Sequence, residues 1–267
     1  MSEKSKGQND RAWEALFEKY DILSRIRQEG KFMISAAQIK EYREPRLMAK
    51  FDHRINLPQI FSDHQLAILP VSRGDYVISH FDAYQTFPEP VPAVSRLSLP
   101  SGLQSLNANH IPSEAIAINC ALASGMLADF LEEESLLPTV SGRMGSGQFD
   151  FQIQNCVTRT PVSVSVNNSQ IEIDAADNLT LPPSLYDIPF EGAASLSLLE
   201  AKRDLSEDFL IRQLYYPFRT WSCRMTKKIR PIFLVYSNGI FSLYEYEFEN
   251  PESYNSLILR KQKNYSI

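Results

Sequence analysis

Cysteine and histidine are scarce in this chain of 267 residues, and neither is spaced as metal ligands are. The three cysteines are odd in number and widely separated, which predicts neither a disulfide framework nor a zinc site. The four histidines also lack metal-ligand spacing. We therefore expect a reducing, cytoplasmic setting.

Long apolar runs are missing as well. No run approaches the roughly 20 residues that a membrane-spanning helix needs, so no membrane partner is expected. Residues 1–6 are polar and mixed in charge, with no apolar signal-peptide region behind them. The glycine-containing segment 141–147 lacks the Lys-Ser/Thr ending of a P-loop. The length of the chain is sufficient for one large domain or two small ones.

Charge is distributed unevenly along the chain. Residues 96–200 contain 3 Lys or Arg and 12 Asp or Glu, a net charge of −9. Residues 201–267 contain 11 basic and 7 acidic residues, a net charge of +4. This order predicts that carboxylates of the acidic segment hold a metal ion and that Arg and Lys of the basic segment bind the phosphates of a ligand.

Carboxylates gather on two segments that have strand character. Side chains two apart on a strand point the same way, so Glu172 and Asp174 share one face and Glu200 and Lys202 share another. If the two strands are neighbours, up to three carboxylates and one ammonium converge on one spot. Oxygen ligands of this kind suit Mg²⁺, which takes one or two carboxylates together with phosphate oxygens and water.

We interpret these residues as a metal-dependent phosphodiesterase site. Asp174 and Glu200 are the expected Mg²⁺ ligands, and Glu172 is expected to support them. Lys202 would orient or deprotonate the attacking water and balance charge. The alternative is an exposed ion pair on a strand. The apolar residues on both faces of segment 196–199 disfavour it, because charges buried at the end of such a strand are costly unless they serve a purpose.

A helix is predicted to follow the second strand. Ser206 is a suitable N-cap, and the two acidic residues after it suit the helix dipole. Pro217 removes a backbone donor, so we expect it to kink or end this helix near Tyr216.

Polar side chains form a stripe on this predicted helix. Arg212, Gln213 and Tyr216 lie three and four residues apart. We expect Arg212 to hold a phosphate and Gln213 to contact the site. Arg219 and the basic residues after it are expected to contact the DNA backbone non-specifically. The alternative is an ordinary solvated helix face.

Residues 1–85 are predicted to form a separate N-terminal module. An amphipathic helix over 11–29, a second helix capped by Ser35, and a hairpin of strands 66–71 and 76–81 suggest a winged-helix-like arrangement. In that arrangement four side chains would face DNA: Arg46, Lys50, His53 and Arg54. The alternative is a small helical cap whose charges are solvated.

The rest of the chain is predicted to form one larger domain. Residues 86–112, rich in Pro and Ser, are expected to be a connector, and 113–267 to be the nuclease domain. A long helix over 114–133, several strands and a hairpin at Asn238-Gly239 predict a mixed sheet flanked by helices. The expected fold class is α/β (α+β).

The site residues resemble a known motif. Asp174 followed by Glu200-Ala201-Lys202 resembles the active-site motif of the PD-(D/E)XK nuclease superfamily, although Ile173 stands where that motif has Pro. This departure leaves open whether Glu172 or Asp174 is the principal first acid.

A longer pattern is similar to a family of bacterial type II restriction endonucleases. It includes segments 208–219 and 230–239, and the N-terminal segments 44–52 and 68–74 are also similar to that family. The resemblance therefore covers most of the chain, and 86–112 matches least.

The resemblance implies a fold and an activity. The fold is a PD-(D/E)XK restriction-endonuclease-like core, and the activity is Mg²⁺-dependent cleavage of double-stranded DNA at a short sequence, leaving 5′-phosphates. It also implies a homodimer and a cognate DNA methyltransferase in a bacterial cytoplasm. The alternatives are another nuclease of the superfamily, in DNA repair or junction resolution, and a non-catalytic winged-helix DNA-binding regulator. A structural or toxin-partner protein is disfavoured by the basic segment 205–231.

Overall fold

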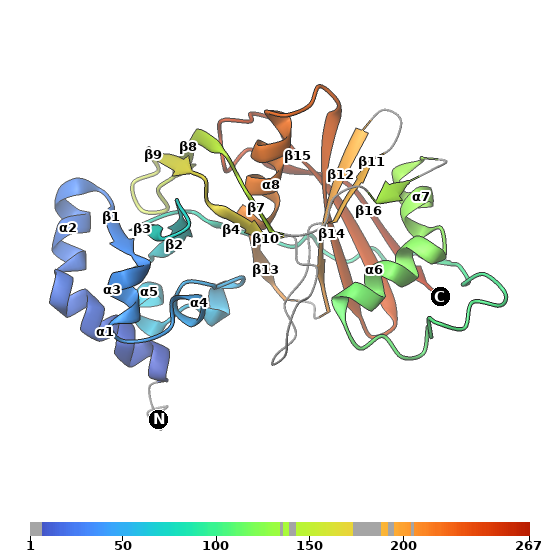
Figure 1. Ribbon diagram of the computed structural model, residues 1–267, viewed down its shortest axis with the longest axis horizontal. Helices are drawn as coiled ribbons and strands as arrows, with labels where there is room; N and C mark the ends of the chain where they lie inside the picture. The colour runs from blue at the N-terminus through green and yellow to red at the C-terminus, as the bar shows by residue number, and fades with distance from the viewer. Residues whose placement is uncertain (1–6, 134–135, 139–142, 173–187, 192–194, 204–205) are drawn as a thin grey trace.

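The computed structural model describes residues 7–133, 136–138, 143–172, 188–191, 195–203 and 206–267. These residues form a mixed α+β protein with several sheets. The N-terminal elements lie on one side of the molecule and the largest sheet on the other (Figure 1). Among the described helices, none has the length and apolar character needed to cross a membrane.

An N-terminal module combines short helices with a three-stranded antiparallel sheet in the order β1-β3-β2. Its helices are α1 (Gln8–Tyr20), α2 (Ile22–Glu29), α3 (Ala36–Lys40), α4 (Pro45–Met48), the 3-10 turn η1 (Arg54–Asn56) and α5 (Gln59–Asp63). Its strands are β1 (Phe32–Ser35), β2 (Ala67–Pro70) and β3 (Asp75–Ser79). The hairpin predicted here is confirmed as β2 and β3.

The module has an apolar core of its own. Trp13, Phe17 and Phe61 are buried and meet edge to face, with ring centroids 4.8 to 6.1 Å apart. The predicted cap at Ser35 is confirmed, because its side chain accepts a hydrogen bond from the Gln38 amide at 3.2 Å. The single helix predicted over 11–29 was wrong.

Asp21 divides that segment into two helices. It adopts a left-handed conformation with φ of 48°, which ends α1 and starts α2. A short polar side chain tolerates this conformation better than most, and the turn lets both helices pack their apolar faces on one core.

The larger part of the chain is built on a seven-stranded sheet in the order β5-β16-β15-β14-β12-β11-β6. Its strands are β5 (Val94–Arg96), β6 (Leu137–Pro138), β11 (Ile188–Glu191), β12 (Ser195–Lys202), β14 (Lys228–Ser237), β15 (Ile240–Phe248) and β16 (Leu257–Ser266). The β12–β14 and β16–β5 pairs are parallel and the other pairs are antiparallel, so the predicted mixed sheet is confirmed.

Helices cover both faces of this sheet (Figure 1). On one face, α6 (Glu114–Ala123) and α7 (Met126–Leu131) pack on Leu199 and Ala201 of β12. On the other, α8 (Arg212–Ser222) packs on Leu196 and Leu198. β12 is buried along its whole length. Because side chains alternate, Glu200 and Lys202 lie on the α8 side.

Three strand pairs complete the fold. They are β8 (Gln148–Gln154) with β9 (Pro161–Asn167), β7 (Arg143–Gly145) with β10 (Gln170–Glu172), and β4 (Tyr84–Thr86) with β13 (Asp208–Leu210). The last pair matters for the site, because it lies against the chain that follows α4. The backbone amide of Leu210 donates to the carbonyl of Asp52 at 2.9 Å.

Several predicted elements have different bounds. The long helix predicted over 114–133 divides at Gly125, whose φ of 75° suits glycine. The predicted connector 86–112 supplies β5, which pairs with β16. The predicted hairpin at Asn238-Gly239 is confirmed, with both residues at positive φ as a tight turn between twisted strands requires.

The helix predicted from Ser206 was wrong at its start, and it does not end near Tyr216. Asp208–Leu210 pairs with β4 as strand β13, and α8 begins only at Arg212. α8 then runs through Pro217 to Ser222. Leu214 and Phe218 are buried in the core on either side of the proline, so packing outweighs the one backbone hydrogen bond that Pro217 cannot make.

Candidate active site

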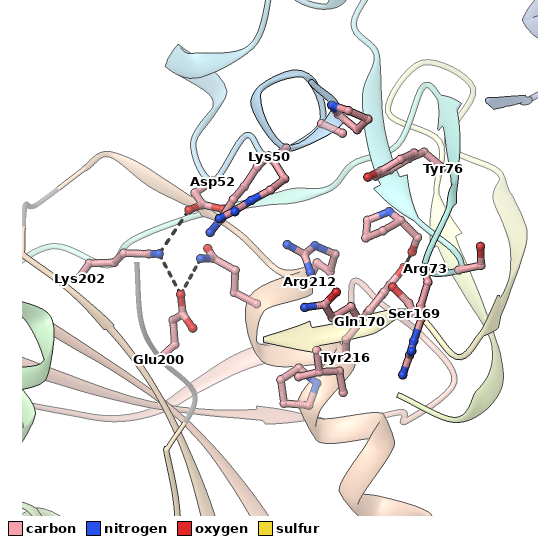
Figure 2. A pocket seen from close by; sticks show the side chains of 18 residues that line it. Lys50, Asp52, Arg73, Tyr76, Ser169, Gln170, Glu200, Lys202, Arg212 and Tyr216 are labelled. Atoms are coloured by element: carbon pink, nitrogen blue, oxygen red, sulfur yellow. Dashed lines mark hydrogen bonds and ion pairs between the residues drawn. The ribbon is translucent and has the colours of Figure 1, made fainter. Parts of the chain in front are cut away.

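The C-terminal end of β12 presents a buried acid and a buried base side by side. Lys202 Nζ lies 2.9 Å from Glu200 Oε1, and the two side chains are 10% and 8% exposed. Both point to the α8 side of the sheet, where Figure 2 shows them at the edge of a pocket. The predicted juxtaposition of Glu200 and Lys202 on one strand face is therefore confirmed.

The first turn of α8 fixes the acid. Gln213 Nε2 donates to Glu200 Oε1 at 2.6 Å, and Gln213 is itself buried. Its Oε1 atom is buried and has no hydrogen-bond partner among the described residues. The predicted contact of Gln213 with the site is thus present.

A third charged group comes from the N-terminal module. Asp52 Oδ2 lies 3.4 Å from Lys202 Nζ, and the Asp52 side chain is 17% exposed. Burial by itself would raise the pKa of Asp52, but the charges of Lys202, Lys50 and Arg212 together lower it. Asp52 is therefore a carboxylate, and Lys202 lies between two negative groups.

These groups open onto a pocket of about 250 Å³ (Figure 2). Nine of its 18 lining residues come from positions 45–76 and nine from positions 169–217, so both parts of the chain form it. Five lining residues are cationic: Arg46, Lys50, Arg73, Lys202 and Arg212. Two are anionic, Asp52 and Glu200. The excess of positive charge suits an anionic ligand.

Arg212 and Tyr216 from the predicted stripe both line the pocket. The Arg212 guanidinium carbon lies 5.7 Å from the Tyr216 ring centroid, and its Nε atom is buried without a hydrogen-bond partner in the described part of the chain. The Tyr216 hydroxyl donates to the Pro70 carbonyl at 2.8 Å, and burial raises its pKa. Tyr216 thus supports the pocket wall, and Arg212 has donor capacity for an anion.

The four N-terminal residues expected to face DNA separate into two pairs. Arg46 and Lys50 line the pocket and are exposed. His53 and Arg54 turn instead to Asp208: the Arg54 amide donates to Asp208 Oδ1 at 3.1 Å, and His53 Nδ1 lies 3.8 Å from the same oxygen. This second pair joins the module to β13.

Arg219 lies outside the pocket. Its guanidinium donates to the carbonyls of Asp150 and Pro251 at 3.1 and 2.6 Å and lies over the Phe149 ring. These contacts join α8 to β8 and to the loop after β15. The structure therefore gives Arg219 a packing role within the body of the protein.

The two candidates for the first acid of the predicted motif, Asp174 and Glu172, are not placed beside Glu200 and Lys202. Asp174 lies outside the described residues. Glu172 closes β10, which pairs with β7, whereas β12 lies between β11 and β14. Among the described residues, the two acidic strands are therefore not neighbours, so the condition for the predicted convergence is not met there. The start of β10 still reaches the site, because Gln170 and Ile171 line the pocket.

Sequence reasoning did not single out Asp52, Arg73, Tyr76 or Glu114. The first three line the pocket. Glu114 opens α6, and burial raises its pKa to about 7, with Lys202 lowering it and Glu200 raising it. The available signal for Asp52 was an isolated acid within a basic stretch, which says nothing about a contact 150 residues away.

Glu114 predicts a pH-dependent stability. Because its folded-state pKa of about 7 exceeds its ordinary value of 4.5, folding stability falls as the pH rises between those values. Glu114→Gln removes this effect. In EDTA, we expect the free energy of unfolding of the variant to gain roughly 1–2 kcal/mol over wild type between pH 4.5 and 7, a figure reduced for solvent screening because Glu114 is only partly buried. Urea melts at several pH values measure it, with the exposed Glu29→Gln as control, and parallel curves for Glu114→Gln and wild type would contradict it.

The donor set fits a hard cation only in part. Glu200 and Asp52 offer carboxylate oxygens, which Mg²⁺ prefers. In the described ranges, however, no group of three or more His, Cys, Asp or Glu side chains could hold a metal ion. Since Mg²⁺ needs only one or two carboxylates when water and phosphate oxygens complete its shell, Glu200 with one further acid would be sufficient.

Two family models together cover most of the chain. Residues 79–266 match the model described as Domain of unknown function (DUF6997), and residues 10–78 match the model described as Domain of unknown function (DUF6996). No curated protein and no solved structure matches the chain. Asp52 and Lys202, which meet in the pocket, lie in different matched regions.

Proposed function

The chain belongs to the family described as Domain of unknown function (DUF6997), and from its pocket we propose a Mg²⁺-dependent endonuclease that hydrolyses phosphodiester bonds of double-stranded DNA. One observation carries the proposal. The buried Glu200–Lys202 pair, at the end of a central strand, opens onto a pocket rimmed by four further cationic side chains.

The alternative is an ion pair that serves only the fold. A buried pair is seldom favourable for stability, because desolvation offsets most of the attraction between the charges. This pair also opens to a cavity, and Gln213 and Asp52 next to it each have a buried oxygen without a partner among the described residues. Unsatisfied polar atoms are costly in a purely structural network, so they support a ligand site.

The residues would divide the work as follows. Glu200 would hold the metal ion together with Asp174 or Glu172, and a bound Mg²⁺ supplies positive charge and makes its water more acidic. Gln213 keeps the Glu200 carboxylate in place. Lys202 orients the water and neutralises charge that develops on the phosphate.

Phosphate groups would be held by the cationic rim. Arg212, Lys50, Arg46 and Arg73 line the pocket from both parts of the chain. A cavity of about 250 Å³ is below the usual volume of a small-molecule pocket, roughly 300–1,000 Å³. The duplex would therefore lie across its mouth, with only the scissile phosphate group entering.

The sequence resemblance extends the proposal to a type II restriction endonuclease. The mixed sheet with its parallel β12–β14 pair and helices on both faces supports a PD-(D/E)XK-like core. Helices preceding the β2–β3 hairpin support a winged-helix-like module. A homodimer, a partner methyltransferase and a bacterial cytoplasmic setting belong to the same proposal.

Digestion of plasmid DNA separates this function from its rivals. If the protein is a restriction endonuclease, we expect cuts at a specific sequence that require Mg²⁺ and are absent in EDTA. A repair nuclease of the same superfamily would cut without a fixed sequence, and a non-catalytic regulator would bind the duplex and leave it intact.

Lys50→Ala is expected to weaken duplex binding roughly 10-fold, the loss of about one charge-assisted phosphate contact. Because one phosphate contact is lost, the salt dependence should also become shallower by about one unit in log–log slope. Band shifts with Ca²⁺ in place of Mg²⁺, over a range of salt concentrations, measure both effects.

A matched control uses another exposed cation of the same module. Arg27 lies on α2 outside the pocket, and its side chain donates to the Leu23 carbonyl. Arg27→Ala should bind DNA as wild type does. Equal affinities for Lys50→Ala and wild type would remove Lys50 from the DNA interface.

A further inference from the structure

The position of Asp52 is unexpected for a recognition module. It belongs to the N-terminal matched region, yet its side chain lies beside Lys202 at the end of β12 (Figure 2). Lys202 Nζ is 3.4 Å from Asp52 Oδ2 and 2.9 Å from Glu200 Oε1. The ammonium therefore has one carboxylate from each matched region of the chain.

The Asp52 carboxylate is not needed to join the two regions. The backbone around it already does so, because the Leu210 amide donates to the Asp52 carbonyl at 2.9 Å and the Tyr84 hydroxyl donates to the Phe51 carbonyl at 2.9 Å. The contacts of His53 and Arg54 with Asp208 add to this junction outside the pocket.

The Asp52 side chain itself is incompletely bonded. Its Oδ1 atom is buried and has no hydrogen-bond partner among the residues that the structure describes. A carboxylate retained only for stability would be expected to satisfy both oxygens. Within the described ranges, the Asp52 side chain accepts its hydrogen bond from the ammonium of the proposed catalytic pair.

We propose that Asp52 is a positioning residue: it holds the Lys202 ammonium beside Glu200, so that the site is complete only when the N-terminal module is seated. This inference rests on the proposed nuclease function. A lysine has a long flexible stem and a compact charge, so its ammonium needs fixed partners to stay in one place. Asp52 and Glu200 supply one partner each.

Asp52→Ala should lower the single-turnover cleavage rate by about 10- to 100-fold at saturating DNA, as loss of an orienting partner typically does. The DNA concentration for half-maximal rate should not rise, because removing a carboxylate leaves the pocket more positive. Asp52→Asn keeps the shape and can still accept from Lys202, so its rate should fall between wild type and Asp52→Ala.

Asp208→Ala is the matched control. It removes a partly buried carboxylate from the same junction, but Asp208 does not line the pocket. Its thermal unfolding should shift, and its cleavage rate at saturating DNA should match wild type. An equal rate loss in both variants would mean that seating alone matters, which overturns the specific role of Asp52.

A second readout does not depend on cleavage. Trace acetylation of the intact protein, followed by mass spectrometry, reports how freely the Lys202 amine reacts. Lys202 should react several-fold faster in Asp52→Ala than in wild type. In Asp208→Ala, its acetylation rate should equal that of wild type. Unchanged reactivity of Lys202 in Asp52→Ala would overturn the positioning role, even if the cleavage rate of that variant is reduced. A wild-type protein that never cuts DNA would instead refute the proposed function. The acetylation result would still show whether Asp52 holds the Lys202 ammonium in place.

Discussion

Lys202→Met is expected to reduce cleavage by roughly 10³-fold or more, because it removes the group that orients water and neutralises charge at the phosphate. Methionine has a similar length and volume, so the end of β12 should stay packed. The change leaves Glu200 and Asp52 without the ammonium that lies 2.9 and 3.4 Å from them. A large loss of stability should accompany it, because two buried carboxylates lose the cation between them.

Single-turnover cleavage of a labelled duplex, with protein in excess, measures this loss apart from binding. The control is Lys263→Met on β16, which removes a lysine that pairs with Asp129 at 2.7 Å outside the pocket. That variant should cut at the wild-type rate. A Lys202→Met protein that retains more than about a tenth of wild-type activity would exclude Lys202 from the chemistry, since loss of one group that stabilises transition-state charge typically costs at least about 10²-fold.

Glu200→Gln is expected to abolish cleavage while leaving DNA binding intact. The glutamine keeps the shape, and its Oε1 atom can still accept from Gln213 Nε2, which lies 2.6 Å from Glu200 Oε1. What is lost is one negative charge and one metal ligand. Without metal, the variant should bind DNA at least as tightly as wild type, because the pocket becomes more positive.

The metal dependence of binding tests the assignment of Glu200 as a metal ligand. In wild type, Ca²⁺ should strengthen duplex binding relative to EDTA, and in Glu200→Gln this difference should vanish. Glu245→Gln is the control, because Glu245 is also a buried carboxylate of the sheet but pairs with Arg230 on β14 at 2.7 Å. A Glu200→Gln protein that keeps the Ca²⁺ effect would place the metal on other residues.

The local sequence pattern was sufficient to predict those contacts of the site whose residues lie on the same strand or on the helix that follows it. Glu200 and Lys202 share a face because strand side chains alternate, and the apolar run before them predicted a central strand. Gln213 and Arg212 were expected near the site because they follow soon after Glu200 on a predicted helix; Gln213 contacts Glu200, and Arg212 lines the same pocket. These predictions needed only periodicity.

The rest of the site depends on packing between distant segments. Asp52 meets Lys202 across 150 residues, and no local pattern encodes the way the N-terminal module lies against β13. The segment Asp208–Leu210 has a good helix-start composition, yet it pairs with β4 because that strand offers it hydrogen-bond partners. β5 formed within a Pro-rich segment for the same reason, since β16 has an edge to pair.

Helix interruptions were also set by the tertiary structure. Asp21 and Gly125 take left-handed conformations that divide two predicted helices, which lets their halves pack in different directions. In contrast, Pro217 does not break α8, because buried neighbours hold the helix on either side. At Asp21 and Pro217 the packing of apolar side chains outweighed a local preference of roughly 1–3 kcal/mol, whereas the left-handed conformation is one that Gly125 adopts readily.

The most direct test of the nuclease proposal is digestion of unmethylated phage DNA with the purified full chain, in Mg²⁺ and in EDTA, with Lys202→Met alongside. We expect discrete fragments with wild type in Mg²⁺, none in EDTA and none with the variant. Sequencing of the ends should give a single short site with 5′-phosphates. Intact DNA on several substrates, despite tight binding, would contradict it and favour a DNA-binding regulator.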